Sequence, residues 1–182
     1  MRKMLGLVLG AVLLPLSVAH AADVTILYTN NQFANATSTD ADGNTIGVFV
    51  TREKGKGAPV DSIFVIVSDP FGNTSFVSGT LPKGAFKVSA HKASVDVDIA
   101  DIAVTASAGS LTGDIIVNWA AGDVTRESGN TKFQFGNTSV NIVGTSTSAS
   151  ATVTGSVGGT DLGNAVGDLS LAHDSVHIHV SN

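Results

Sequence analysis

The sequence predicts an all-β protein: a single-domain antiparallel β-sandwich, Ig-like or jelly-roll-like, that follows a cleaved signal peptide. Three observations carry this prediction: an apolar leader, alternation of apolar and polar residues with a period of two, and turn-forming residues between the alternating segments. Such alternation is typical of strands with one buried and one solvated face. Segments that recur at intervals of roughly 8 to 12 residues indicate an antiparallel sandwich or barrel, of which we expect the sandwich.

The leader has the pattern of a secretory signal peptide. Two basic residues are followed by the apolar run 4–18 and by the small-x-small cleavage site Ala19-His20-Ala21. The apolar run is interrupted by Pro15 and is shorter than the 18 or more apolar residues that a membrane-spanning helix requires. We therefore expect a signal peptide over residues 1–21 and one mature domain over residues 22–182, either secreted or periplasmic.

The net charge limits the classes of partner that we expect, and the cysteine content indicates the kind of organism from which the chain comes. Cleavage after Ala21 leaves eight basic and fifteen acidic residues, a net charge of −7 with histidine neutral. An acidic chain repels phosphate backbones, so we expect no nucleic-acid partner. The chain has no cysteine, which among exported proteins favours a bacterial origin. Aromatic residues are too few for the belts of membrane-spanning strands, so we expect a mature chain that does not span a membrane.

Alternation marks the expected strands along the whole mature chain. The alternating apolar residues are Val24, Ile26, Tyr28, Ile46, Val48, Val50, Ile63, Val65, Val67, Phe76, Phe86, Val88, Val95, Val97, Ile99, Ile115, Val117, Trp119, Phe133, Phe135, Val140, Ile142, Val176, Ile178 and Val180. Asp42-Gly43 fits a two-residue hairpin turn, and residues 69–73 carry proline and glycine at turn positions. Residues 143–159 are nearly all small or β-branched, which favours a hairpin over a flexible linker.

The C-terminal histidines are the strongest candidate for a chemical site. If Val176, Ile178 and Val180 face the core, His177 and His179 share the opposite face, about 6.6 Å apart along the strand. Two imidazoles at this spacing can hold a transition metal ion, with His173, Asp174 or His91 as further candidate ligands. The alternative is that these histidines are solvated strand residues without a ligand.

Two acidic clusters offer weaker candidates for a cation site. Residues 40–44 resemble a short calcium loop, but the bidentate glutamate and the flanking helices of an EF-hand are missing, so we interpret them as a turn. Asp96, Asp98 and Asp101 could bind calcium with oxygens from a neighbouring strand. Carboxylates of this kind more often keep a sheet soluble.

The remaining charged and aromatic candidates have structural interpretations. We interpret the basic cluster of Arg52, Lys54 and Lys56 as part of a solvated loop rather than as a binding patch. Trp119 and Tyr28 are residues that a sugar-binding platform would use, but each is in phase with apolar neighbours, which predicts a place in the core.

No catalytic pattern selects a nucleophile, an acid–base pair or a phosphate-binding loop, so we expect no enzyme and no resident cofactor. The sequence therefore predicts an exported non-enzymatic β-sandwich protein with a structural, adhesive or partner-binding role at the cell surface or in the periplasm. Its expected partner is a protein or a component of the extracellular matrix or cell surface, and its oligomeric state stays open. The alternatives are a metal-binding module built on His173, His177 and His179, and a carbohydrate-binding domain.

Overall fold

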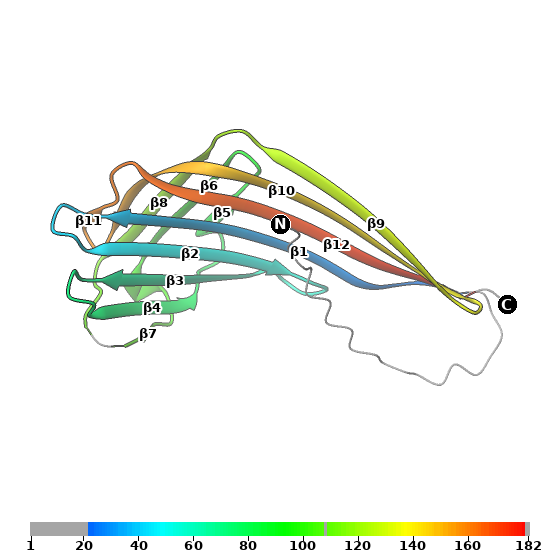
Figure 1. The fold of residues 1–182 in the computed structure, drawn as a ribbon. Helices are drawn as coiled ribbons and strands as arrows, with labels where there is room; N and C mark the ends of the chain where they lie inside the picture. The colour runs from blue at the N-terminus through cyan, green and yellow to red at the C-terminus, as the bar shows by residue number, and fades with distance from the viewer. Residues whose placement is uncertain (1–21, 108, 181–182) are drawn as a thin grey trace.

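The structure is a computed structural model that describes residues 22–107 and 109–180, and these residues form an all-β protein (Figure 1). The predicted signal peptide lies outside the described residues. The strands are β1 (Ala22–Thr39), β2 (Thr45–Lys54), β3 (Val60–Ser68), β4 (Thr74–Thr80), β5 (Phe86–Val88), β6 (Lys92–Asp98), β7 (Thr105–Ala106), β8 (Asp114–Ala121), β9 (Thr125–Phe135), β10 (Thr138–Val157), β11 (Thr160–Asp161) and β12 (Ala165–Val180). One turn of 3-10 helix, η1 (Ile99–Asp101), follows β6.

All twelve strands belong to one antiparallel sheet. Its main order is β5-β6-β8-β10-β12-β1-β2-β3-β4-β7, and β9 and β11 both pair with β10. The all-β antiparallel class is thus confirmed, whereas a division into the two packed sheets of a sandwich is not shown, because the described strands form a single sheet that is not closed. In the described part of the chain, no helix has the length and apolar character needed to cross a bilayer.

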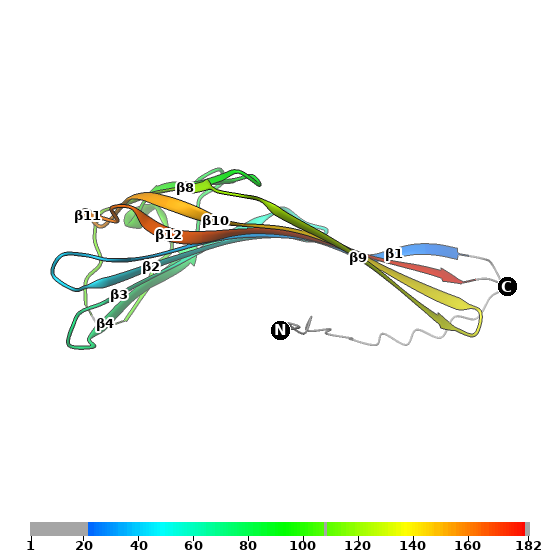
Figure 2. The same cartoon turned by 45° about the horizontal axis from the view of Figure 1, so that its top comes forward.

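One half of the sheet curls around a hydrophobic core, and we call it the curled half (Figures 1 and 2). Strands from both ends of the sheet order contribute, so that β5, β6 and β8 face β1, β2 and β3 across the core. The indole of Trp119 on β8 is 1% exposed, and its Nε1–H donates to the carbonyl oxygen of Asn35 on β1 at 2.6 Å. The core role that alternation predicts for Trp119 is therefore confirmed.

An arginine joins the two sides of the curled half. Arg52 on β2 forms a bidentate ion pair with the buried Asp61 on β3, at 2.6 and 2.7 Å. The same guanidinium donates to the carbonyl oxygen of Phe86 on β5 at 2.5 Å and lies 5.4 Å from the centre of the Phe86 ring. The prediction of a solvated loop is wrong for Arg52, because Asp61 supplies a buried partner that the local sequence does not indicate.

Three strands are much longer than the usual 3 to 10 residues. β1 has 18 residues, β10 has 20 and β12 has 16, and each runs out of the curled half into an extension of the sheet (Figure 2). The hairpin expected over residues 143–159 is wrong, because residues 143–157 continue β10 without a turn. Only Gly158-Gly159 forms the turn, with φ angles of 57° and 85°.

The same turn connects β1 to β2 and β3 to β4, with the pattern Asp-x-x-Gly-Asn. Asp40 Oδ1 accepts hydrogen bonds from the backbone amides of Asp42 and Asn44, and the Asn44 side chain donates to Asp40 Oδ2 at 2.9 Å. Asp69 and Asn73 repeat these bonds in the second turn. The first turn is longer than the two-residue hairpin predicted at Asp42-Gly43, since Thr39 and Thr45 are its closing pair.

Candidate functional site

The extension of the sheet beyond the curled half is the most distinctive part of the molecule, and we call it the arm. It consists of β9 with the adjoining parts of β10, β12 and β1, that is residues 125–135, 138–148, 170–180 and 22–33. β2 accompanies only the base of the arm, because its pairing with β1 begins at Asn30. Figures 1 and 2 show these strands extending well away from the curled half.

The apolar side of the sheet changes between the two halves. In the curled half the core side chains of β10 and β12 have odd numbers, such as Val153 and Leu169, and they define the inner face. β10 and β12 pair from Thr138↔Val180 to Val153↔Ala165 without a shift in register. Because side chains alternate between faces, the even-numbered Ile142 and Ile178 lie on the opposite, outer face. The arm is thus apolar on the face that is turned away from this chain's own core.

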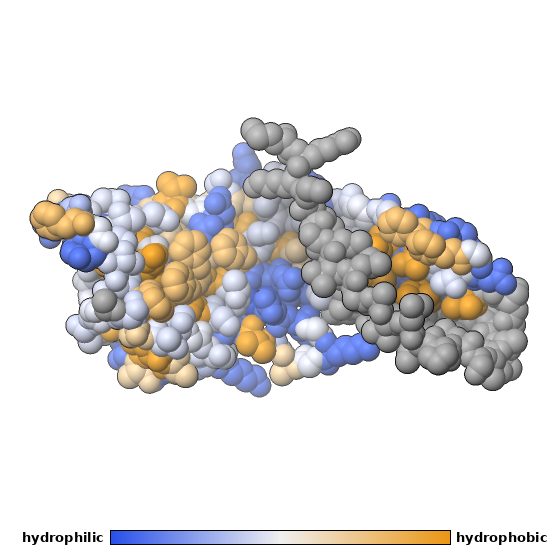
Figure 3. Space-filling view, turned by 60° about the horizontal axis from the view of Figure 1, so that its bottom comes forward, coloured by the Kyte–Doolittle hydropathy of each residue, from blue (hydrophilic) through white to orange (hydrophobic). Residues whose placement is uncertain are grey.

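A contiguous apolar patch covers the outer face near the end of the arm. Phe133 is 42% exposed and Phe135 is 67% exposed, with ring centroids 6.3 Å apart, and Phe133 is paired with Val140, which is paired with Ile178. We call this surface the tip patch; it comprises Phe133, Phe135, Val140, Ile142, Val176, Ile178 and Val180. Figure 3 shows apolar side chains gathered at the arm end. Exposed apolar patches of this kind mark interaction sites.

A hollow of about 320 Å³ adjoins the tip patch. It exists because Gly129 of β9 is paired with Gly144 of β10, which is paired with Asp174 of β12, so two neighbouring positions lack side chains. Asp174 Oδ1 lies only 2.7 Å from the place that a Cβ on Gly144 would occupy. The carboxylates of Asp174 and Glu127 therefore line this hollow beside the backbone of the two glycines.

A second apolar surface lies on the outer face of the curled half. Phe49 of β2 is paired with Phe64 of β3, with ring centroids 6.2 Å apart, and Phe76 of β4 lies 5.7 Å from Phe64. Phe64 is 37% exposed, and the rings border a shallow hollow of about 380 Å³. The outer face therefore carries aromatic surface in both halves of the molecule.

The inner face of the arm carries the C-terminal histidines. His177 is paired with Asn141, His179 with Ser139 and His173 with Thr145, so all three histidines lie on the face opposite the tip patch. The Oδ1 atom of Asn141 is buried and has no hydrogen-bond partner among the described residues. Within residues 22–107 and 109–180, no group of three or more His, Cys, Asp or Glu side chains is placed to hold a metal. Metal binding by these histidines stays a prediction.

The acidic clusters have structural roles where the structure describes them. The side-chain hydrogen bond from Asn44 holds the pKa of Asp40 below its usual value, and Asn73 does the same for Asp69. Asp98 begins η1 by accepting the amide of Ala100 at 2.9 Å, which is a helix cap. The turn interpretation of residues 40–44 therefore agrees with the structure.

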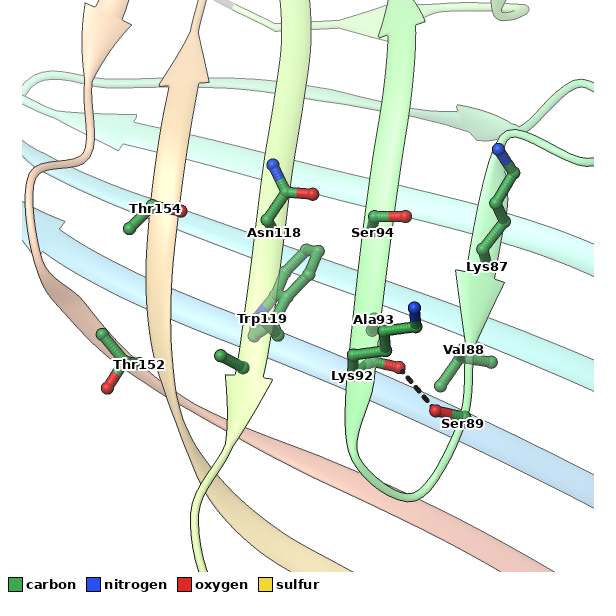
Figure 4. A pocket seen from close by; sticks show the side chains of 11 residues that line it. Lys87, Val88, Ser89, Lys92, Ala93, Ser94, Asn118, Trp119, Thr152 and Thr154 are labelled. Atoms are coloured by element: carbon green, nitrogen blue, oxygen red, sulfur yellow. Dashed lines mark hydrogen bonds between the residues drawn. The ribbon is translucent and has the colours of Figure 1, made fainter.

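A hollow of about 500 Å³ lies over β5, β6, β8 and β10 (Figure 4). Thr154, Asn118, Ser94 and Lys87 form one cross-strand row, and Lys92 flanks it. Figure 4 shows Trp119 directed behind these strands, so its indole is not a stacking platform for a sugar. The lining residues include ammonium, hydroxyl and amide groups but no His, Asp, Glu or Cys, so they can bind a polar ligand without a general base. The side chain of Tyr28 lies outside the described part.

Sequence reasoning identified the apolar residues of the arm as core residues and so missed the tip patch. The signal was present in the change from odd to even apolar positions along β10 and β12, which cannot face one core on an unshifted strand. Comparison with protein families, with curated proteins and with solved structures gives no match.

Proposed function

We propose that this chain is an exported, non-enzymatic protein with a structural, adhesive or partner-binding role, and that the arm is its binding surface. The curled half, whose sheet folds over its own core in the manner of a sandwich, acts as the scaffold. The leader over residues 1–21 directs the chain to the periplasm or beyond, where a protein or a matrix or surface component is the partner.

One observation carries the proposal: the apolar face of the arm does not face the protein's own core. On β9, Phe133 and Phe135 remain 42% and 67% exposed, and the apolar side chains of the patch on β10 and β12 are only partly buried. Burying apolar area contributes about 25 cal/mol per Å², and aromatic side chains are typical anchors of interfaces. A partner that covers the tip patch gains this energy.

The test compares two sets of exposed phenylalanines. Phe133→Ser combined with Phe135→Ser removes the aromatic part of the tip patch, and Phe71→Ser, at a side chain 91% exposed in the β3–β4 turn, is the matched control. Each protein is expressed with its own leader in the bacterium that produces it, and its retention on the cell envelope or surface is measured after washing. We expect the double variant to be released and the Phe71 variant to be retained. Equal retention of all three proteins contradicts the proposal.

A metal-binding function is the second candidate, and the placement of His177 and His179 on one face favours it. Asn141, whose Oδ1 is buried, is the cross-strand partner of His177, and carbonyl oxygens of this kind orient the imidazoles of metal-bound histidines. A metal at a hundredfold excess over its dissociation constant would stabilise the fold by about 2.7 kcal/mol. The check is thermal melting with Zn²⁺, Cu²⁺ or Ni²⁺ on the wild type and on the His177→Ala, His179→Ala double variant. An unchanged wild-type midpoint eliminates this candidate.

A further inference from the structure

The edge of the arm offers a second, independent binding feature. β9 pairs with β10 along its whole length, and no described strand pairs with its other side. All eleven residues of β9 are exposed, and Figure 1 shows the strand along the border of the arm. An unpaired strand of this length presents a row of backbone donors and acceptors to a further strand.

We propose that β9 pairs with β9 of a second copy of this chain, so that two arms form one continuous antiparallel sheet. The proposal goes beyond the proposed function, because it uses the edge of β9 in addition to the tip patch, which stays on the outer face of the joined sheet. A two-fold axis perpendicular to the sheet brings two β9 strands together antiparallel and keeps outer face with outer face. It also sends the two arms in opposite directions, so that the curled halves lie at opposite ends of the joined sheet.

Charge restricts the register of this pairing. Only registers centred on a residue keep the two outer faces on the same side, because paired residues must then have the same parity. An axis at Gly129 would place Arg126 opposite Lys132, and an axis at Lys132 would place that lysine opposite its own copy. Like charges directly opposite each other are destabilising. The two registers that pair most of β9 without such a conflict are centred on Asn130 and on Thr131.

The aromatic residues select between these two registers. Each register places one phenylalanine opposite Glu127, namely Phe133 for an axis at Asn130 and Phe135 for an axis at Thr131, so this contact does not separate them. An axis at Thr131 places Phe133 opposite Gly129 of the other copy, beside the hollow over Gly129 and Gly144. An aromatic ring beside a cross-strand glycine covers the backbone that glycine leaves exposed. Only the axis at Thr131 sets the ring of each copy against Gly129 of the other, so we place the axis at Thr131.

Disulfide formation between single cysteines tests this register directly, because the chain has no cysteine of its own. In the exported protein, Thr131→Cys places one cysteine of each copy at the two-fold axis. Ser128 of one copy lies opposite Gln134 of the other. A dimer of Ser128→Cys alone, or of Gln134→Cys alone, therefore has no two cysteines close together, whereas a mixed dimer of the two variants does. Thr74→Cys, exposed on β4, is the control. We expect dimers under mild oxidation from Thr131→Cys and from the mixture, at several times the yield of the control.

The result that overturns the proposal is a yield from Thr131→Cys no higher than that from Thr74→Cys. Charged substitutions at the axis provide a second test. The Thr131→Lys and Thr131→Glu proteins should each be monomeric by light scattering, and mixing them should restore dimers. A mixture that stays monomeric also overturns the proposal. Failure of these tests while the Phe133 and Phe135 variant still loses surface retention shows that the arm binds another molecule. If substitutions in the arm change neither dimer formation nor surface retention, the proposed function itself is wrong.

Discussion

The junction of Arg52, Asp61 and Phe86 gives the sharpest prediction for stability. The perturbation is Arg52→Met, which keeps an unbranched apolar stem and removes the guanidinium group with its charge. Asp61 is 7% exposed, so the substitution leaves a buried carboxylate without its counter-ion. Breaking a buried pair in this way costs about 3 to 5 kcal/mol. For a domain of this size we expect the melting temperature to fall by about 6 to 20 °C.

The assay is urea unfolding followed by the fluorescence of the single tryptophan, with Lys54→Met on the exposed end of β2 as the control. A double-mutant cycle with Asp61→Asn isolates the pair, and we expect a coupling energy above about 2 kcal/mol because the two side chains share two hydrogen bonds. A coupling energy below about 0.5 kcal/mol is typical of an exposed ion pair. Such a value would refute the argument that Arg52 and Asp61 form a buried ion pair.

Three further predictions concern the core and the turns. Trp119→Ala should lower the free energy of unfolding by about 3 to 5 kcal/mol, measured by denaturation with circular dichroism, and a change below about 1 kcal/mol would contradict its core role. Gly167→Ala should lower the melting temperature, because a Cβ there would overlap the carbonyl oxygen of Asn35, and an unchanged midpoint would contradict that geometry. Asp69→Asn should destabilise the fold at neutral pH, because hydrogen bonds lower the pKa of Asp69 in the folded state and so stabilise it above the unfolded pKa of about 3.9. That difference should vanish as the pH falls through the folded pKa, and a pH-independent difference in melting temperature would speak against it.

Local patterns predict most of the strands of this protein but not their arrangement. Ile46, Val48 and Val50 alternate as expected and are buried on β2, and Ile115, Val117 and Trp119 do the same on β8. The period of two reports that one face of a strand is apolar. It does not report which molecule covers that face, so the apolar positions of the arm were assigned to this chain's core.

The length of β10 and the contact between Arg52 and Asp61 could not be predicted from short stretches of sequence, because both depend on residues that are distant in the chain or not yet paired. Residues 143–157 are small and polar enough to suggest a break, yet they are held in β10 by pairing with β12 along one side and with β8 and β9 along the other. Arg52 looks like part of a charged loop until Asp61, nine residues later, folds beside it. The shared face of His177 and His179 follows from alternation alone, whereas any further ligand depends on tertiary structure.

The pairing of Ala22 with Val180 sets the mechanical response of the arm. β1 begins and β12 ends at the same end of the arm, where Ala22 is paired with Val180 (Figure 1). Tension applied between these two ends would separate neighbouring strands like a zipper, loading one ladder pair at a time. Tension that enters at the arm end and leaves through the curled half instead runs along β10 and β12, so that sixteen register pairs from Thr138↔Val180 to Val153↔Ala165 share the load in shear. The same arm is therefore weak when Ala22 and Val180 are pulled apart and strong when it is pulled along its length.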